Sequence, residues 1–373
     1  MSDLFFYGTL RHMPLLRLVL GGSDADLVQA TLVDHAVYWA KDQAFPMIVA
    51  EPGAVAKGIL ARGLSTEDVA RLNYYEGGFA YDLSIMEVST ETGFESAEVF
   101  FPQAGIWDKG EPWSLADWQI RWGGITMGAA EDVMARYGHQ SAAEIQRLFP
   151  FLRARAWAGE LAADTAPQTL RRTPEAGDFA IVKDRPGFDG FFRMRAFDLQ
   201  YKRFDGSLSG DVPRECLWAF DAALVLPYDP ITDQVLLIEQ LRFGPVVRGD
   251  KAPWVLEPIA GLVDAGEDPA DTARREAMEE AGIALTDLRP MTKVYGSPGY
   301  STEFFHCYLA VCDLSEVQGG QGGLPSENED IRSHVVSFDA AMALVDSGEV
   351  NAGPLAMMLL WLARARESLR STS

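Results

Sequence analysis

Three glutamates within one predicted helical turn are the residues of this sequence best suited to chemistry. Glu276, Glu279 and Glu280 stand at positions i, i+3 and i+4, so in a helix their carboxylates emerge on one face. Like charges at this spacing destabilise a helix, and a divalent cation relieves the repulsion because Mg²⁺ prefers oxygen ligands. The spacing therefore predicts a metal site, against the simpler alternative of an acidic helix face in contact with solvent.

The segment around these glutamates, residues 261–283, has the sequence GLVDAGEDPADTARREAMEEAGI. Its composition predicts a helix over 271–281, which Gly282 ends as the residue after the last turn. Arg275 is expected to pair with Glu267 across the corner between loop and helix and to hold the acidic set rigid. The whole segment fits the pattern Gly-x5-Glu-x7-Arg-Glu-apolar-x-Glu-Glu-x-Gly-apolar at every fixed position. These fixed spacings favour the metal site over an exposed acidic face.

Four stretches of the chain provide the elements that must position this segment. Residues 1–110 alternate apolar runs with glycines and predict short strands and turns, whereas 111–163 have helical periods. The polar, proline-bearing stretch 164–177 predicts a linker. Strand patterns return in 178–373 and surround the acidic helix, which predicts an α/β sandwich. The sequence thus predicts two domains joined by a linker.

Composition excludes several classes of partner. The formal net charge of −22 repels phosphate backbones, so we expect no nucleic-acid partner. The most apolar stretch, 355–363, is far shorter than the roughly 18 residues that cross a bilayer, so we expect no membrane association. No basic segment precedes an apolar one at the N-terminus, which argues against a secretory signal. Cys216, Cys307 and Cys312 are too few for a disulfide framework and indicate free thiols in the cytoplasm.

The 261–283 pattern is the motif of the Nudix hydrolases, and the chain from about 180 to 369 resembles their ADP-ribose pyrophosphatase branch. The resemblance implies an α/β/α sandwich and hydrolysis of ADP-ribose to AMP and ribose 5-phosphate with Mg²⁺ or Mn²⁺. Another nucleoside diphosphate sugar is the nearest alternative substrate. A domain that only senses a nucleotide is disfavoured, because a sensor has no need for the intact glutamate set. The branch also implies a homodimer through residues 178–225.

The same resemblance implies roles for residues along this half of the chain. Arg275 and Glu280 belong to the catalytic helix, and Glu327 matches the loop glutamate that activates water, with Glu329 as its neighbour. An exposed acidic loop is the alternative. The implied metal ligands are Glu257, the carbonyl of Ala260, Glu276, Glu279 and Glu280. The implied substrate-binding residues are Arg214, Glu215, Arg242, Pro298 and Glu303.

Two features of the substrate site leave alternatives open. Arg214 and Glu215 match an arginine-arginine-glutamate element of the resembled enzymes, but Pro213 replaces its first arginine. This departure puts the choice of substrate in question. Phe191 and Phe192 could stack on adenine, although aromatic residues in a strand more often lie in a core.

The first part of the chain resembles a second family. FFYGTLRHMPLL and LNYYEGGFAYDL are similar to segments of the γ-glutamylcyclotransferase-like fold, a small β-barrel, over residues 3 to 105. The resemblance implies that the main chain of the Tyr-Gly-Thr-Leu turn binds an anionic substrate and that Glu76 moves the proton during ring closure. Burial of this carboxyl among Tyr74, Tyr75 and Phe79 would raise its pKa. The residues of the turn are Tyr7, Gly8, Thr9 and Leu10, and Tyr81 follows Glu76.

This second motif is a weaker indication of function than the 261–283 motif because it is short. A retained fold used only for docking or dimerisation is the alternative to catalysis in the N-terminal domain. Together the two domains resemble bacterial proteins associated with tellurite resistance, although no residue gives a chemical reason for that link. The expected protein therefore has two domains of the α+β and α/β classes, a barrel with a helical extension and a Nudix sandwich.

Overall fold

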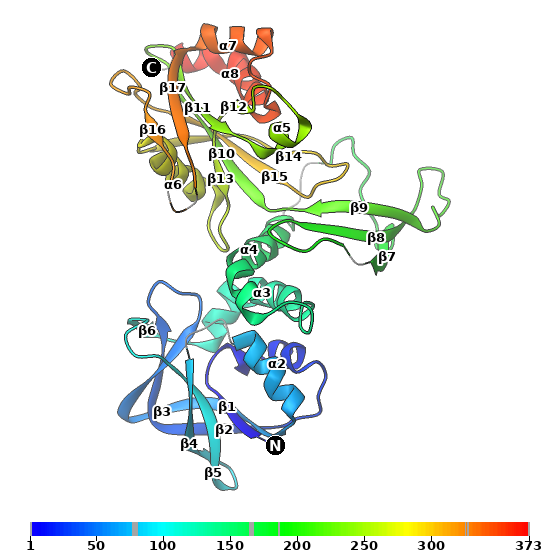
Figure 1. The fold of residues 1–373 in the computed structure, drawn as a ribbon, viewed down its shortest axis with the longest axis vertical. Helices are drawn as coiled ribbons and strands as arrows, with labels where there is room; N and C mark the ends of the chain where they lie inside the picture. Colours follow the sequence, from blue (N-terminus) through cyan, green and yellow to red (C-terminus); the bar gives the residue numbers. More distant parts are fainter. Residues whose placement is uncertain are drawn as a thin grey trace. The chain divides into compact units, whose positions relative to one another are not determined.

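The computed structural model describes residues 2–76, 81–163, 168–185, 187–324, 326 and 328–371. The chain forms two compact units, Met1–Asp164 and Thr165–Ser373, which Figure 1 colours along the sequence. No helix in the described part of the chain is long and apolar enough to span a membrane. All three cysteines are free thiols, as the sequence predicts.

The first unit contains a closed β-barrel, as the resemblance implies. Its five strands follow the order β3-β1-β5-β4-β2, and β2 pairs back onto β3, which closes the sheet. A short strand, β6, extends β2 at one end. The barrel interior is filled by aliphatic and aromatic side chains such as Phe5, Leu32, Ile48, Leu60 and Val99. The strands are β1 (Ser2–Phe6), β2 (Asp26–Ala40), β3 (Pro46–Leu64), β4 (Tyr81–Thr90), β5 (Gly93–Pro102) and β6 (Lys109–Pro112).

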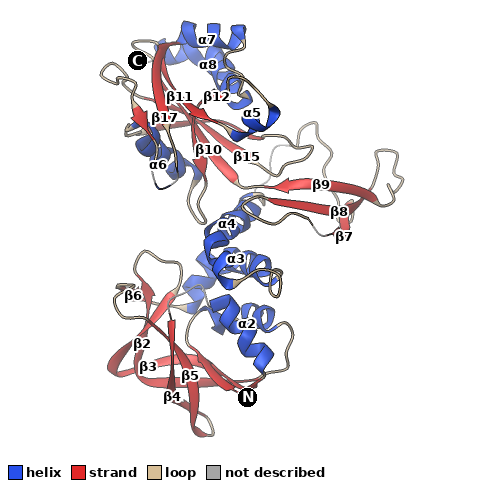
Figure 2. Ribbon diagram, viewed as in Figure 1, coloured by secondary structure: helices blue, strands red, loops and turns tan. Residues whose placement is uncertain are grey.

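Helices cover one side of the barrel and form a second core with it (Figure 2). They are η1 (Thr9–Arg11), α1 (Met13–Leu20), α2 (Thr66–Glu76), α3 (Leu115–Met134) and α4 (Ala142–Leu161). Ser114 caps α3, and Ser141 forms a capping box with Glu144 at the start of α4. Trp118 of α3 and Leu152 of α4 are fully buried against the strand and helix residues of this unit. The two long helices are therefore part of the folded unit.

The second unit is built on an eight-stranded sheet. Its main path runs β14-β15-β10-β11-β17-β16, while β12 pairs with β11 and β13 with β10. Helices α7 (Phe338–Ser347) and α8 (Gly353–Ser371) pack on one face through a shared apolar core, and α6 (Pro269–Ala281) lies on the other (Figure 1). This is the α/β/α arrangement that the resemblance implies. The strands are β10 (Asp221–Asp229), β11 (Gln234–Leu241), β12 (Trp254–Glu257), β13 (Ile259–Leu262), β14 (Asp287–Tyr295), β15 (Phe304–Val311), β16 (Gln321–Gly322) and β17 (Ile331–Ser337), and a short helix α5 spans Phe243–Arg248.

A separate three-stranded sheet precedes these strands within the same unit. Strands β7 (Phe179–Arg185), β8 (Arg193–Tyr201) and β9 (Val212–Trp218) pair in sequence order and project from the main sheet in Figure 1. Their link to it includes a hydrogen bond that the Leu217 N–H donates to the Tyr300 carbonyl, 2.7 Å long. Every residue of β7 is exposed to solvent.

Candidate active sites

Helix α6 carries the acidic motif, and local sequence fixes both of its ends. Asp268 caps the N-terminus by accepting a hydrogen bond from the Ala270 N–H, and Pro269 occupies the first helical position. The helix therefore begins two residues earlier than the predicted Asp271. At the other end Gly282 adopts the left-handed conformation with φ of 66° and ends the helix as predicted.

Arg275 organises the carboxylates around it. Its Nη1 donates to Glu276 Oε1 at 2.6 Å and to Glu279 Oε2 at 3.0 Å. Its Nε and Nη2 reach the two oxygens of Glu267 at 3.3 Å, which is the pair that the spacing predicts. Glu267 also accepts a hydrogen bond from the Thr272 hydroxyl at 2.7 Å. One guanidinium thus bridges loop and helix and holds two of the three motif glutamates.

The third motif glutamate is the most buried. Glu280 is 1% exposed, and its Oε2 accepts a hydrogen bond from the Ala260 N–H at 3.1 Å. Burial raises its pKa to about 9, and the charges of Glu276 and Glu329 add to the rise. Burial likewise raises the pKa of Glu276 to about 7, although Arg275 opposes the shift. These carboxylates are held where a proton or a cation must compensate their charge.

Two glycines let other segments approach these glutamates closely. A Cβ on Gly261 would lie 1.8 Å from Glu276 Oε1, and one on Gly322 would lie 1.9 Å from the carbonyl oxygen of Glu280. Gly322 belongs to the short strand β16, and the neighbouring Gly323 N–H donates to the Glu279 carbonyl at 3.1 Å. The glycine-rich loop is therefore packed directly against the back of α6. The sequence motif includes Gly261, but nothing in the sequence indicated this role for Gly322.

We expect Gly322→Ala to lower the melting temperature of the second unit. The added methyl group meets main chain that cannot rotate away, and overpacking of this kind costs about 1–3 kcal/mol. Each kcal/mol corresponds to roughly 2–4 °C for a domain of this size. Gly320→Ala is the matched control, because its Cβ would have no heavy atom closer than 3.9 Å. Equal melting temperatures of the two variants in differential scanning calorimetry would show that the packing argument is wrong.

A second group of predicted residues is assembled around Arg242. This side chain donates from Nε to Glu257 Oε2 at 2.7 Å. Burial raises the pKa of Glu257, of Glu280 and of Glu303, while the charge of Arg242 lowers each of them. The Arg242 side chain is 44% exposed, so its guanidinium is accessible beside the partly buried Glu257 and Glu303. The structure thus gathers Arg242, Glu257, Glu280 and Glu303, which are far apart in sequence, in one region.

Other predicted residues lie at the edges of this region. Pro298 is in the turn between β14 and β15, and this turn is bonded to β9 through Tyr300 and Thr302. Arg214 and Glu215 are exposed on β9. Glu327 lies outside the described residues, so the structure does not test its predicted position. Glu329 is described, and its charge raises the pKa of both Glu276 and Glu280.

The predicted aromatic pair is not part of a closed core. Phe191 and Phe192 are 41% and 46% exposed. Their rings contact each other with centroids 4.7 Å apart, and Phe191 contacts Phe220 at 5.6 Å. Both rings are therefore partly exposed to solvent.

The donor set of the acidic helix suits a hard divalent cation. In the described part of the chain no three His, Cys, Asp or Glu side chains converge on one point in the way that a metal site requires. Arg275 instead holds oxygens of Glu276 and Glu279, and a bound cation would compete with it. Glu280 is buried and Glu276 partly buried, the pKa of both is raised, and the set offers only oxygen, which is the chemistry that Mg²⁺ or Mn²⁺ compensates. The predicted ligand set remains a prediction.

We expect the metal-free protein to lose stability as pH rises from about 5 to 9. The pKa values of Glu276 and Glu280, about 7 and about 9 in the folded chain, exceed the ordinary value of about 4.3. The folded state therefore binds more protons than the unfolded state in this window, and stability decreases with pH. The decrease should be several degrees in melting temperature, measured in a chelator at each pH.

Excess Mg²⁺ should remove much of this decrease, because a cation compensates the ionised carboxylates of the folded state only. The Glu280→Gln variant should show a shallower pH dependence in the chelator, since it has no buried carboxyl to ionise at that position. A wild-type melting temperature that stays constant or rises between pH 5 and 9 would contradict the burial of these charges.

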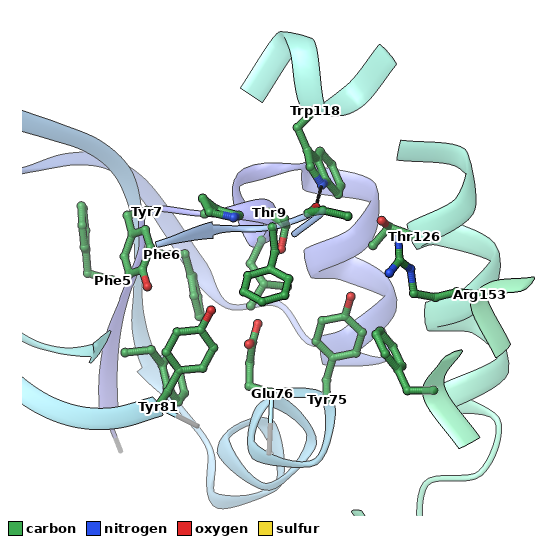
Figure 3. Close-up of a pocket in the computed structure, with 17 residues that line it drawn as sticks. Phe5, Phe6, Tyr7, Thr9, Tyr75, Glu76, Tyr81, Trp118, Thr126 and Arg153 are labelled. Carbon is green, nitrogen blue, oxygen red and sulfur yellow. Dashed lines mark hydrogen bonds between the residues drawn. The ribbon is translucent and has the colours of Figure 1, made fainter. Parts of the chain in front are cut away.

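The first unit contains its own cavity of about 90 Å³, shown in Figure 3. The predicted turn forms one wall with Tyr7, Gly8, Thr9 and Leu10, and Glu76 lies opposite at the end of α2. Gly8 packs closely against Pro46, since a Cβ there would lie 3.0 Å from Cγ of the Pro46 ring. Further walls come from aromatic residues and from α3 and α4: Phe5, Phe6, Ala44, Phe45, Pro46, Tyr75, Tyr81, Phe100, Trp118, Thr126, Phe149 and Arg153.

Glu76 is the acidic group of this cavity. Its carboxylate points into the space between Tyr75 and Tyr81 (Figure 3). Burial raises its pKa to about 7, and its charge in turn raises the pKa of Tyr7, Tyr75 and Tyr81. Among the described residues Glu76 has no hydrogen-bond or ion-pair partner. A carboxyl with these properties can exchange a proton with a ligand near neutral pH.

Comparison with known proteins decides the family. The model of the NUDIX domain matches residues 219–356. An ADP-ribose pyrophosphatase of Escherichia coli K12 is 35% identical over 205 residues, which cover 55% of this chain and 97% of that protein. The chain belongs to the Nudix hydrolase family. A second relative, an ADP-ribose pyrophosphatase of Haemophilus influenzae, is 38% identical over 50% of this chain and 86% of that protein.

Two further matches extend this assignment. The GDP-mannose pyrophosphatase of Citrobacter koseri is 31% identical over 49% of this Nudix hydrolase and 93% of its own length. The first unit matches the model described as gamma-glutamyl cyclotransferase, AIG2-like, over residues 4–119. The Nudix hydrolase therefore carries a cyclotransferase-like barrel before its hydrolase domain, and both predicted resemblances are confirmed.

Proposed function

We propose that this Nudix hydrolase cleaves the diphosphate linkage of ADP-ribose to give AMP and ribose 5-phosphate. The observation that supports it most is the glutamate set of α6, which Arg275 holds together beside the buried Glu280. The relatives named above favour ADP-ribose and leave GDP-mannose or another nucleoside diphosphate sugar as the alternative. Mg²⁺ or Mn²⁺ is the proposed cofactor.

The proposed chemistry is attack of a water oxygen on one phosphorus, with cleavage of the bond from that phosphorus to the bridging oxygen. The bridging oxygen leaves with the other phosphate, and a carboxylate accepts the proton of the water. A divalent cation, when bound, supplies polarisation of the phosphoryl oxygens and a more acidic water. Glu276, Glu279 and Glu280, with Glu257 and the Ala260 carbonyl, are the proposed ligands. Glu327 is the proposed base, and Glu329 is the alternative.

Residues around Arg242 would hold the substrate. Arg242 is exposed enough to donate to a substrate phosphate while it keeps its contact with Glu257. Glu303 lies within reach of the same positive charge. Pro298, Arg214 and Glu215 stand on the neighbouring turn and strand, where the nucleoside or the terminal ribose would bind.

The direct test measures AMP release with Mg²⁺ from ADP-ribose and from NADH, and GMP release from GDP-mannose. We expect the highest kcat/KM for ADP-ribose. A higher kcat/KM for GDP-mannose would show that GDP-mannose is the better substrate, and the proposed cleavage of a diphosphate linkage would still hold. No hydrolysis of any of the three would contradict the proposal.

A second activity is supported by the cavity of the first unit. In γ-glutamyl cyclotransfer the α-amino nitrogen attacks the γ-carbonyl carbon, the amide C–N bond breaks, and the free amine and 5-oxoproline are released. Once the α-ammonium group has lost one proton to solvent, Glu76 would accept the second proton as the α-nitrogen attacks and would donate it to the leaving amine. Docking without catalysis is the alternative for this unit. Release of 5-oxoproline from varied γ-glutamyl amines by the full chain distinguishes the two.

We further propose a homodimer formed through residues 178–225. The three-stranded sheet exposes many large apolar side chains, and a surface of this kind favours contact with another chain. A molar mass of twice the chain mass of 41.0 kDa in light scattering is expected. The exposed apolar residues of this part are Phe179, Ile181, Val182, Phe188, Phe191, Phe192, Met194, Tyr201, Phe204 and Leu208.

The proposed location of the protein is the cytoplasm. The proposed domain boundaries are 1–110 for the barrel, 111–163 for the helical extension, 164–177 for the linker and 178–373 for the hydrolase domain.

A further inference from the structure

The cavity of the first unit extends beyond the part of the chain that matches the cyclotransferase model. That match ends at residue 119. Thr126 of α3 and Phe149 and Arg153 of α4 lie after it and line the same cavity as Glu76. The helical extension therefore completes the cavity, and it brings one positive charge to the wall.

Arg153 is held in place by the packing of α4. Its neighbours Leu152 and Ala154 are buried, at 1% and 4% exposed, so the helix cannot easily turn. Its guanidinium carbon lies 5.3 Å from the centre of the Trp122 ring, a stacking that fixes the side chain along α3. The cation is thus part of a rigid wall and keeps a defined direction.

Arg153 and Glu76 enter the cavity from different sides. In Figure 3 the guanidinium points inward beside Thr126, whereas the Glu76 carboxylate rises from α2, and the Tyr75 hydroxyl stands near both. Both charges act on that hydroxyl, with opposite effects on the pKa of Tyr75. Aromatic side chains line much of the cavity, and an apolar lining of this kind strengthens the attraction of each group for an opposite charge.

Because both groups line one small cavity, a ligand that contacts both would carry a negative group for Arg153 and an N–H donor for Glu76. The α-carboxylate and α-amine of an amino acid are two such groups. We propose that Arg153 binds the α-carboxylate of a γ-glutamyl-type ligand while its α-nitrogen faces Glu76. The identity of the ligand rests on the cyclotransfer proposed above, whereas the role of Arg153 as the carboxylate-binding residue does not require turnover.

Calorimetric titration of the full chain with two lactams tests this role. 5-Oxoproline carries the carboxylate, and 2-pyrrolidinone is the same ring without it. We expect wild type to prefer 5-oxoproline by roughly 30-fold, the order of magnitude for a hydrogen bond to a charged group. Arg153→Met should bind the two rings about equally, and Arg153→Lys should be intermediate. Arg147→Met is the matched control, because Arg147 is exposed on the same helix.

The outcomes separate this inference from the proposed activity. An unchanged preference in Arg153→Met, or no preference or no binding in wild type, overturns the role of Arg153 and points to the main chain of the turn as the carboxylate site. Release of 5-oxoproline from γ-glutamyl amines is measured independently in wild type. If wild type releases 5-oxoproline but Arg153→Met still prefers 5-oxoproline over 2-pyrrolidinone, the proposed activity holds and the role of Arg153 is wrong. A lost preference without turnover would support the inference and reject the activity.

Discussion

Replacing Glu280 by Gln should reduce AMP release from ADP-ribose by roughly 10³-fold, the size expected for loss of an acid–base group or a metal ligand. The variant should nevertheless fold normally. Without a cation the Glu280 carboxyl, with a pKa of about 9, is neutral at pH 7, and the amide of glutamine matches it in size. The amide oxygen can still accept the hydrogen bond of the Ala260 N–H. The loss would therefore be chemical and would not reflect unfolding.

Steady-state kinetics with Mg²⁺ and a melting curve on the same preparation provide the measurement. Glu367→Gln, on the exposed side of α8, is the control and should have wild-type values of kcat and KM. If Glu280→Gln kept wild-type activity, the role given to the α6 glutamates would be wrong. If its activity and its melting temperature at pH 7 both collapsed, the argument that glutamine substitutes for the neutral acid would be wrong.

Replacing Glu76 by Gln should reduce 5-oxoproline release by about 10²- to 10⁴-fold, the usual contribution of a general acid–base residue. The raised pKa of this carboxyl, about 7, also predicts how the cyclotransferase rate depends on pH. Wild-type kcat/KM should increase with pH up to about 7, because only the ionised carboxylate can accept the proton of the substrate. Measurement of 5-oxoproline from a γ-glutamyl amine across pH 5 to 9 tests both expectations.

The two glutamine variants serve as controls for each other. Glu76→Gln should leave AMP release unchanged, and Glu280→Gln should leave 5-oxoproline release unchanged, because each residue belongs to a separate folded unit. Glu131→Gln, exposed on α3, should affect neither reaction. Wild-type cyclotransfer by Glu76→Gln would show that another residue moves the proton.

The sequence predicted the local features of the Nudix site and missed those that depend on folding. Spacing alone placed Glu276, Glu279 and Glu280 on one helical face and paired Arg275 with Glu267, because residues close in sequence keep fixed geometry in a helix. Nothing local could show that Glu280 would be the deeply buried member. That burial depends on how α6 packs against strands β13 and β10 in the folded unit.

The same difference between local motifs and tertiary packing explains which cavity residues of the first unit could be predicted. The turn at Tyr7 to Leu10 and the carboxyl of Glu76 were predicted from short motifs, and the structure places them around one cavity. Arg153 carries no motif, since its contribution depends on how α4 packs against α3. A solvent-facing position on a helix is the ordinary expectation for an arginine, and tertiary packing alone changes it.

The order in which the parts of the second unit can fold during synthesis follows from its strand pairing. The sheet of β7, β8 and β9 uses only residues 179 to 218, so it can form as soon as this short stretch leaves the ribosome. The main sheet is completed later, because strand β10 also pairs in parallel with β15, with pairs such as Ala223 and His306, and the intervening chain includes α6. Distant parallel pairings form slowly. The apolar surface of the early sheet is therefore exposed before the rest of the unit is complete, and exposed apolar surface of this kind favours aggregation during folding.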